Sequence, residues 1–300
     1  MDNQTNVTAI VTTYKREPEI VKRAVKSILN QTYKGIKVVV VDDSPATYDL
    51  RENVRKEVCK LNPNIIYVKH EQNMGACVAR NTGLKYADTE YVAYLDDDDE
   101  WVETKIEKQI KLFTDSKLGL VYCGHSIKYD VDERVIPEKR EFHRGDVFDK
   151  LICKNFIGST SFPLIRTKCI KEVGEFDPLM LSGQDADLWL RITEKYLVDY
   201  VAESLVTYHI HTGEQISTNP HKKVKGLERL NEKNREYLEK NKEAYWTRFM
   251  QIIPYYIWNG QVEKAKMTWK RCVRKCPYKI KGNMKYFLII LRERRKKNRS

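Results

Sequence analysis

The sequence predicts a doubly wound α/β domain with a mostly parallel central sheet, followed by a helical C-terminal region. Over the first 125 residues, β-branched runs alternate with segments whose apolar residues recur at helical spacing. Some of these runs are almost continuously apolar, which is typical of parallel strands buried on both faces. From residue 221 onward the pattern is helical. We therefore expect an α/β domain over 1–218 and a basic helical region over 219–300.

The first expected strand, 7–12, precedes a helix over 18–30 whose apolar residues form one stripe. The later elements of the alternation are a strand at 36–41, a helix ending near residue 60, a strand at 65–68, a helix at 75–87, a strand at 91–95, a helix at 101–113 and a strand at 118–123. The less regular part that follows holds a helix at 184–196 and short strands at 198–201 and 205–209. Beyond it, Pro254 and Pro277 are expected to interrupt the helices.

The composition indicates a globular protein, because 41% of the residues are apolar and 32% are charged. No apolar run reaches the roughly 18 residues that a membrane-spanning helix needs. Residues 1–5 lack a basic-then-apolar signal pattern. Seven scattered cysteines do not suggest a disulfide framework. We therefore expect a cytoplasmic protein, peripheral on the inner face of the cell membrane where it meets lipid.

The charge is unevenly distributed along the chain. Residues 221–300 hold 24 Lys and Arg against 7 Asp and Glu, whereas the remainder holds 30 against 35. A mildly acidic body argues against nucleic acid as a partner, and a basic tail favours a polyanionic surface. In 281–300 an apolar patch, 286–291, precedes a basic cluster, which suits a helix lying on an anionic membrane. The alternative is a packed terminal helix with a solvated end.

Acidic residues follow the strand expected at 91–95. Asp96, Asp97, Asp98 and Asp99 are consecutive, and Glu100 extends the run. Such a cluster is tolerated when a divalent cation neutralises it, and carboxylates with positions left for water and phosphate suit Mg²⁺ or Mn²⁺. The alternative is a solvated acidic turn that caps the next helix. The residues alone leave both open.

Other polar groups gather at the same predicted edge, where ligands of such sheets bind. Asp42 and Asp43 end a strand, and the alternative for them is an ordinary Asp–Ser–Pro turn. Arg80, early in a helix that follows a glycine, suits a phosphate or an aspartate, or is a surface arginine. Asp185, in the first turn of a helix after Gly183, suits a general base or is a plain acidic helix start.

Seven blocks follow one another along the chain: 10–16 (Ile-Val-Thr-Thr-Tyr-Lys-Arg), 27–33, 40–44, 73–81, the acidic stretch 95–101, 174–177 and 184–191. In this order they resemble the family 2 glycosyltransferases, whose nucleotide-diphospho-sugar transferase fold is called GT-A. They cover about 210 residues between 7 and 218. The resemblance implies a GT-A domain followed by the helical extension.

The resemblance also implies roles for individual residues. Asp185 is the expected catalytic base, and Asp98 and His211 are the expected metal contacts, with the register of the aspartate run open by one position. The implied nucleotide-sugar-binding residues are Thr12, Tyr14, Asp42, Asp43, Arg80, Asp96 and Asp97. His209 stands where an arginine is common, so the roles of His209 and His211 stay open. The segment 156–163 is expected to meet the acceptor.

The implied function is inverting, metal-dependent transfer of a sugar from a nucleotide-diphosphate donor, UDP-linked by family habit. The acceptor would be a hydroxyl of a glycan or a lipid-linked oligosaccharide in bacterial surface polysaccharide synthesis. The alternative is a catalytically inactive protein that binds a sugar nucleotide or a polyanion. A nucleotidyltransferase fits less well, because residues 12–16 lack the glycine-rich phosphate loop of that class.

Overall fold

The computed structural model describes residues 6–129, 134–210 and 219–297, with side chains as far as Leu291. The chain divides into two compact units. The first comprises Met1–Phe148, Asn155–Pro178 and Asp185–Thr212, and the second comprises Asp149–Lys154, Leu179–Gln184 and Gly213–Ser300.

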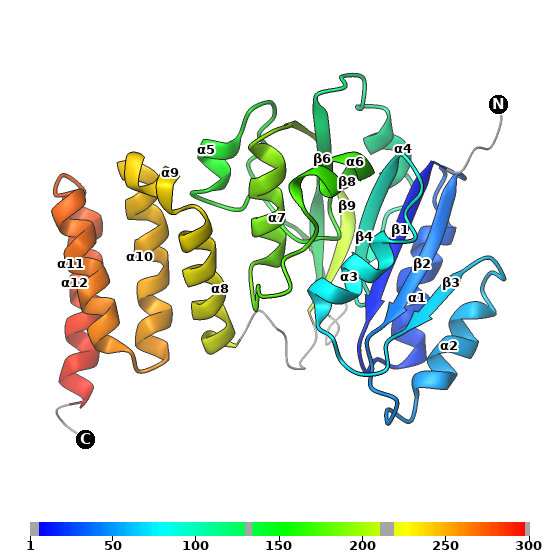
Figure 1. Cartoon of the computed structure of the whole chain (residues 1–300), viewed down its shortest axis with the longest axis horizontal. Coiled ribbons are helices and arrows are strands. Elements are labelled where there is room, and N and C mark those ends of the chain that lie inside the picture. The colour runs from blue at the N-terminus through cyan, green and yellow to red at the C-terminus, as the bar shows by residue number, and fades with distance from the viewer. Residues whose placement is uncertain (1–5, 130–133, 211–218, 298–300) are drawn as a thin grey trace. The chain divides into compact units, whose positions relative to one another are not determined.

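The first unit holds a nine-stranded mixed sheet in its described residues, and four neighbouring strands of it are parallel. In sheet order these are β3 (Ile66–Lys69), β2 (Ile36–Asp42), β1 (Val7–Thr13) and β4 (Tyr91–Asp96), which Figure 1 shows side by side. The helices between them in the chain are α1 (Pro18–Leu29), α2 (Arg51–Cys59) and α3 (Ala76–Leu84). The strand register places Thr12 beside Asp96 and Thr13 beside Asp42. The parallel α/β sheet predicted from the sequence is thus confirmed, and the carboxyl ends of its strands share one edge.

The other half of the sheet is mixed. The strand order continues from β4 through β8 (Leu164–Arg166), β6 (Leu118–Tyr129), β9 (Leu197–Ile210) and β5 (Glu100–Trp101), and β7 (Val135–Pro137) pairs with β6. The short β8 runs antiparallel to both β4 and β6, whereas β6 and β9 are parallel. The helices of this half are α4 (Lys105–Ile110), α5 (Phe148–Leu151), α6 (Thr167–Val173) and α7 (Gln184–Thr193). The unpredicted β8 thus joins the two parallel groups.

Two local predictions for this half were wrong. The two strands expected at 198–201 and 205–209 are one strand, β9, which stays paired through a register shift opposite Gly124. A Cβ atom on Gly124 would lie 2.9 Å from the carbonyl oxygen of Glu203, so the absence of a side chain permits this bulge. The helix expected from residue 101 begins only at Lys105, because Glu100 and Trp101 pair with β9 instead.

The second unit is built of helices that pack side by side (Figure 1). They are α8 (Pro220–Lys233), α9 (Arg235–Lys240), α10 (Lys242–Trp258), α11 (Val262–Lys275) and α12 (Ile280–Lys297). The interruption predicted at Pro254 is wrong, since α10 continues through it. Burial of Ile252, Ile253 and Tyr256 around this proline favours the continuous helix. None of the helices in the described part of the chain has the length and apolar character needed to cross a bilayer.

A buried histidine makes the stability of the first unit depend on pH. The ring of His125 on β6 stacks on Phe162 at 4.5 Å, and its Nδ1 lies 3.1 Å from a carboxylate oxygen of Glu138. Burial lowers the pKa of His125 to about 4; Glu138 opposes this change and Arg140 adds to it. As the pH falls, His125 is therefore protonated at about pH 6.5 in the unfolded chain but only at a lower pH in the folded chain.

We expect the neutral form of His125 to contribute stability that is full above about pH 6.5 and is lost as the pH falls toward about 4. Between about pH 7 and pH 4 the wild type should lose about 2 kcal/mol more unfolding free energy than His125→Gln, after discounting for solvent screening. Urea unfolding at both pH values measures this difference. Equal losses in the two proteins would contradict it.

Candidate active site

The acidic run forms a tight turn at the carboxyl end of β4. The backbone N–H of Asp99 donates to the carbonyl oxygen of Asp96 at 3.0 Å. Along this turn the side chains alternate between solvent and interior: those of Asp96 and Asp98 are 29% and 21% exposed, and Asp97 and Asp99 are buried. Among the four aspartates of the run, Asp96 and Asp98 are therefore the two that a ligand from solvent can reach.

Asp96 is held in place by three donors from outside the turn. Arg80 donates from Nη2 to Oδ1 at 2.7 Å, Thr160 donates to the same oxygen at 3.1 Å, and Ser159 donates to Oδ2 at 3.2 Å. The guanidinium of Arg80 is buried on α3 and lies over the ring of Phe176, 5.4 Å from its centroid. The predicted neighbours Arg80 and Asp96 are thus an ion pair, with Asp96 fixed in a single orientation.

Arg16 contacts the next two aspartates. Its Nε donates to Asp97 Oδ1 at 3.0 Å, and its Nη2 donates to Asp98 Oδ2 at 2.5 Å. Burial raises the pKa of Asp97 above its ordinary value, and the Arg16 guanidinium opposes that change. The preceding residue, Lys15, has a φ of 49°, a left-handed conformation that a lysine rarely adopts. Its N–H donates to Ser44 Oγ, so this strained turn brings Arg16 against the acidic run.

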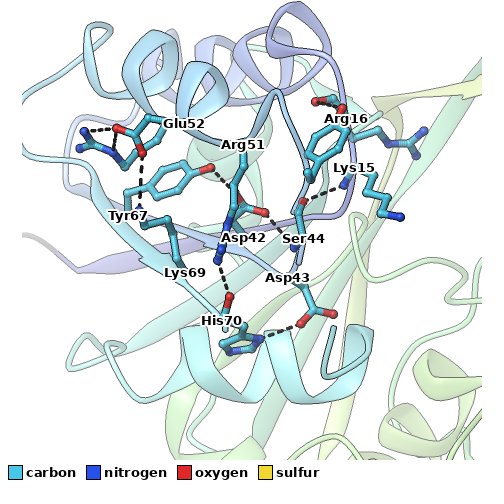
Figure 2. A network of polar contacts seen from close by, with 12 residues as sticks. Lys15, Arg16, Asp42, Asp43, Ser44, Arg51, Glu52, Tyr67, Lys69 and His70 are labelled. Atoms are coloured by element: carbon cyan, nitrogen blue, oxygen red, sulfur yellow. Dashed lines mark hydrogen bonds and ion pairs between the residues drawn. The ribbon is translucent and has the colours of Figure 1, made fainter. Parts of the chain in front are cut away.

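The carboxylate of Asp42 faces the protein interior (Figure 2). Its Oδ1 accepts from the N–H of Ser44 at 2.9 Å, and its Oδ2 accepts from the hydroxyl of Tyr67 at 2.9 Å. The guanidinium of Arg51 lies 3.7 Å from Oδ2. Burial raises the pKa of Tyr67, and Asp42 adds to this. Asp42 therefore fixes the turn after β2, and its oxygens already have protein donors.

Asp43 points toward the start of α3 instead. Its two carboxylate oxygens accept from the backbone N–H groups of Met74 and Gly75, each at 2.8 Å. His70 Nδ1 lies 2.7 Å from Asp43 Oδ1 (Figure 2). Nε2 of the same ring lies 3.0 Å from Thr82 Oγ1. Asp43 thereby ties the end of β2 to the helix that supplies Arg80.

Thr12 and Tyr14 lie at the end of β1, on either side of Thr13. Thr12 is half-buried and pairs with Asp96 in the sheet. Tyr14 is 43% exposed, and the ammonium of Lys15 lies 5.5 Å from its ring centroid. An exposed aromatic ring beside the acidic turn offers a flat apolar face on which a base can stack.

Asp185 is linked to Asp96 through one loop, 155–161. Asn155 donates from Nδ2 to Asp185 Oδ2 at 3.0 Å, and its Oδ1 accepts from the N–H of Gly158 at 3.0 Å. The next two residues of the loop are Ser159 and Thr160, which bond to Asp96. The loop is held to α7 because the indole of Trp189 donates to the carbonyl oxygen of Gly158 at 3.0 Å. The predicted base and the predicted acidic cluster thus share one rigid connection.

Of the two candidate histidines, His209 and His211, only His209 lies among the described residues. His209 is buried, and its Nε2 lies 2.8 Å from Glu100 Oε1, on the neighbouring strand β5. This hydrogen bond lowers the pKa of Glu100. His209 therefore pairs within the sheet. His211, the second predicted metal contact, lies outside the described residues.

The acidic turn fits a metal that is shared with a substrate. Within residues 6–129, 134–210 and 219–297, no group of three or more His, Cys, Asp or Glu side chains is arranged to hold a metal ion. Asp96 and Asp98 nevertheless offer two exposed carboxylates. Mg²⁺ takes one or two carboxylates and completes its shell with water and phosphate oxygens, and Mn²⁺ accepts similar oxygen ligands. The donor set therefore suits Mg²⁺ or Mn²⁺ bound together with a diphosphate.

Several residues of the site were not assigned a role from the sequence. His70 directly follows the third parallel strand, so its position at the same sheet edge was a usable signal. Arg16 stood in a recognised block beside a strand end, although nothing local indicated its aspartate partners. Asn155 and the hydroxyls of 159–161 reach Asp185 and Asp96 only through the tertiary fold. Within the segment 156–163, expected to meet an acceptor, residues 159–161 contact Asp96.

Curated proteins similar to this chain are glycosyltransferases of bacteria and archaea. WcaA of Escherichia coli strain K12, a predicted glycosyl transferase of colanic acid biosynthesis, is 28% identical over 90% of this chain and 92% of its own length. WfaP of Escherichia coli, named a UDP-Glc:α-D-GlcNAc-diphosphoundecaprenol β-1,3-glucosyltransferase, is 29% identical over 73% of this chain and 82% of its own.

Solved structures share the fold. A mannosyltransferase from Pyrobaculum calidifontis, determined with GDP-mannose and Mn²⁺, matches with a TM-score of 0.59 and 16% identity, over 90% of this chain and 76% of its own. The GT-A fold with C-terminal helices is thereby established. The family model for glycosyl transferase family 2 matches residues 8–174, which is more than half of the chain and includes β2, β3, β4 and all of β1 except Val7. Together with the order of the blocks around Asp96, this shows that the chain belongs to glycosyl transferase family 2.

Proposed function

We propose that the protein transfers a hexosyl or hexosaminyl group from a UDP-linked donor to a hydroxyl of a lipid-linked oligosaccharide, with inversion at the anomeric carbon. The observation that supports this most directly is the connection between Asp185 and Asp96 through the loop 155–161. In this proposal the loop joins the carboxylate that would act as base to the acidic turn that would bind the diphosphate. The names of WfaP and WcaA support a UDP-sugar donor, a lipid-linked acceptor and a role in surface polysaccharide synthesis.

In this proposal Asp185 accepts the proton of the acceptor hydroxyl. As the proton leaves, the hydroxyl oxygen forms a bond to the anomeric carbon, and the bond from that carbon to the diphosphate breaks on the opposite face. Asn155 keeps the Asp185 carboxylate oriented through its 3.0 Å hydrogen bond. The nucleoside diphosphate leaves with the electron pair of the broken bond.

The donor would bind along the carboxyl ends of β1, β2 and β4. Tyr14 offers its exposed ring to the base, and Thr12 and Asp43 belong to the same sheet edge. Asp96 would bind near the ribose and the metal, with Arg80 holding it in place, and the buried Asp97 would act through its hydrogen bond from Arg16. Asp98 would hold Mn²⁺ or Mg²⁺, together with His211 where that residue reaches the site. A bound divalent ion would neutralise the charge that develops on the leaving diphosphate.

Calorimetry tests the donor site before any sugar is known. The purified full chain is titrated with UDP, GDP and dTDP, first with Mn²⁺ and then with EDTA. Metal-dependent binding of one nucleotide is the expected result, and a product assay with its nucleotide sugars follows. Absence of binding to every nucleotide in both conditions would overturn the proposal. Binding without transfer to any acceptor would indicate an inactive sensor.

The contacts of Arg16 predict how the thermal stability of the nucleotide-free protein depends on a divalent ion. Because its guanidinium neutralises Asp97 and Asp98, Arg16→Gln should lower the melting temperature in EDTA by several degrees. A divalent ion at the turn would replace the missing positive charge, so saturating Mn²⁺ should raise the melting temperature of the variant more than that of the wild type.

Arg23→Gln is the matched control for this thermal measurement. Arg23 also contacts the turn, but it donates to the backbone oxygen of Asp98 at 3.0 Å and lies 3.5 Å from Glu100 Oε1, so its partners are not the carboxylates of Asp97 and Asp98. The decrease in melting temperature caused by Arg23→Gln should therefore be the same with and without Mn²⁺. If Arg16→Gln behaves in the same way, the idea that Arg16 and the ion neutralise the same carboxylates is wrong.

A further inference from the structure

The terminal helix of the second unit has an apolar stripe that faces solvent. Ile280, Met284 and Leu288 on α12 are 70%, 54% and 49% exposed. Residues four apart lie one above the other on one face of a helix, so these three form a continuous row. The unit exposes other large apolar side chains too, among them Trp258 and Met267, but these lie on other helices.

A neighbouring face of α12 is fixed against the other helices, so the stripe is not a surface left over from a loosely packed helix. Asn283 is buried; its Oδ1 accepts from the indole of Trp246 at 2.7 Å, and its carbonyl oxygen accepts from the indole of Trp269 at 2.8 Å. The ring of Phe287 stacks on Trp269 with centroids 5.1 Å apart. These contacts set the rotation of α12 and thereby turn the stripe outward from the unit.

Basic residues accompany the stripe. Lys281 and Lys285 are exposed, and each directly follows a member of the row in the sequence. Beyond Leu291 the sequence reads Arg-Glu-Arg-Arg-Lys-Lys-Asn-Arg-Ser, with six basic residues and one acidic. The whole stretch 221–300 has a net charge of +17. An apolar row beside dense positive charge complements a lipid bilayer with anionic headgroups, because the acyl chains are apolar and the headgroups carry negative charge.

We propose that α12 docks the protein on an anionic membrane, with Ile280, Met284 and Leu288 inserted among the lipids and Lys281 and Lys285 at the headgroups. A second copy of the chain fits this face less well, because it would bring two strongly basic surfaces together. The docking surface is independent of the transfer reaction: it would hold for a catalytically inactive protein too. It differs from the expectation for 281–300, because only Leu288 of the apolar patch 286–291 belongs to the row, whereas Phe287 and Ile290 pack within the unit.

The full chain is tested by co-sedimentation with vesicles of phosphatidylcholine alone and with one quarter phosphatidylglycerol. The wild type should bind only the anionic vesicles. The triple variant Ile280→Ser, Met284→Ser, Leu288→Ser should bind them at least about tenfold more weakly, and so should Lys281→Glu with Lys285→Glu. Because all five side chains are exposed, circular dichroism should show unchanged folding; the charge variant tests the proposal even if the triple variant folds poorly.

Matched controls change the same chemistry elsewhere. Val135→Ser with Ile136→Ser removes exposed apolar side chains from β7, and Lys85→Glu with Lys139→Glu reverses two exposed charges of the first unit. Both should bind anionic vesicles like the wild type. Wild-type binding by the α12 variants, or equal binding of both vesicle types by the wild type, would overturn the proposal. A dimer in sedimentation velocity that the triple variant abolishes would assign the stripe to self-association instead.

Discussion

Asp185→Asn should lower the rate of sugar transfer by about a thousandfold while leaving donor affinity unchanged. General base catalysis contributes about 10²–10⁴-fold, and an amide cannot accept the hydroxyl proton. The substitution keeps the shape of the side chain, and its oxygen can still accept from Asn155, which now bonds to Asp185 Oδ2 at 3.0 Å. The loop 155–161 and the turn at Asp96 should therefore stay in place.

Two measurements separate this result from a general loss of structure. Steady-state transfer with the donor identified by calorimetry gives the rate, and titration of the same variant with the nucleoside diphosphate gives the affinity. Glu175→Gln removes an exposed carboxylate of the same unit and serves as the control, with no expected change in either quantity. Transfer by Asp185→Asn at near the wild-type rate would eliminate Asp185 as the base.

A smaller loss of rate is expected for Asn155→Ala, because Asn155 only positions the base. This variant leaves the Asp185 carboxylate able to accept a proton but removes the bond that orients it. The role of Asn155 could not be predicted from the sequence alone. Asn155 and Asp185 are thirty residues apart, and no local spacing relates them.

The parts of the fold that follow from local pattern were predicted correctly. Strands β1 to β4 are short, β-branched and bounded by turn residues, so their period and their parallel arrangement were visible in the sequence. The three-residue β8 was not, since so short a strand has no period and exists only because β4 and β6 lie on either side. The continuous β9 depends likewise on its long pairing with β6, which outweighs the polar residues in its middle.

The candidate site divides in the same way. Acidic residues at strand ends could be placed at one edge because parallel strands bring their carboxyl ends together. The partners of these residues could not be predicted, because aspartates at strand ends have different roles. Asp42 is buried and accepts hydrogen bonds from Ser44 and Tyr67, while the side chain of Asp96 stays partly open to solvent. Burial and hydrogen bonding, which distinguish a structural aspartate from a ligand-binding one, are set by tertiary contacts.

That distinction predicts the register of the aspartate run. Asp98→Asn should weaken the metal-dependent binding of the nucleoside diphosphate by about a hundredfold or more, since loss of even an outer-shell partner of a metal ligand costs about 10–100-fold. Asp98 is exposed to solvent at the turn, next to the similarly exposed Asp96. An asparagine there keeps the volume but removes the negative charge that would hold the ion.

Asp99→Asn is the matched comparison, one position along the same turn. Asp99 has no exposed surface. Burial raises its pKa well above the ordinary value, and Asp96 and Asp98 add to this. It cannot reach a ligand in solvent, so Asp99→Asn should bind the nucleotide like the wild type. If calorimetry with Mn²⁺ and with EDTA shows the reverse order, with Asp98→Asn intact and Asp99→Asn impaired, then the metal-binding register is shifted by one residue, and burial in the protein without ligand does not identify the aspartate that holds the ion.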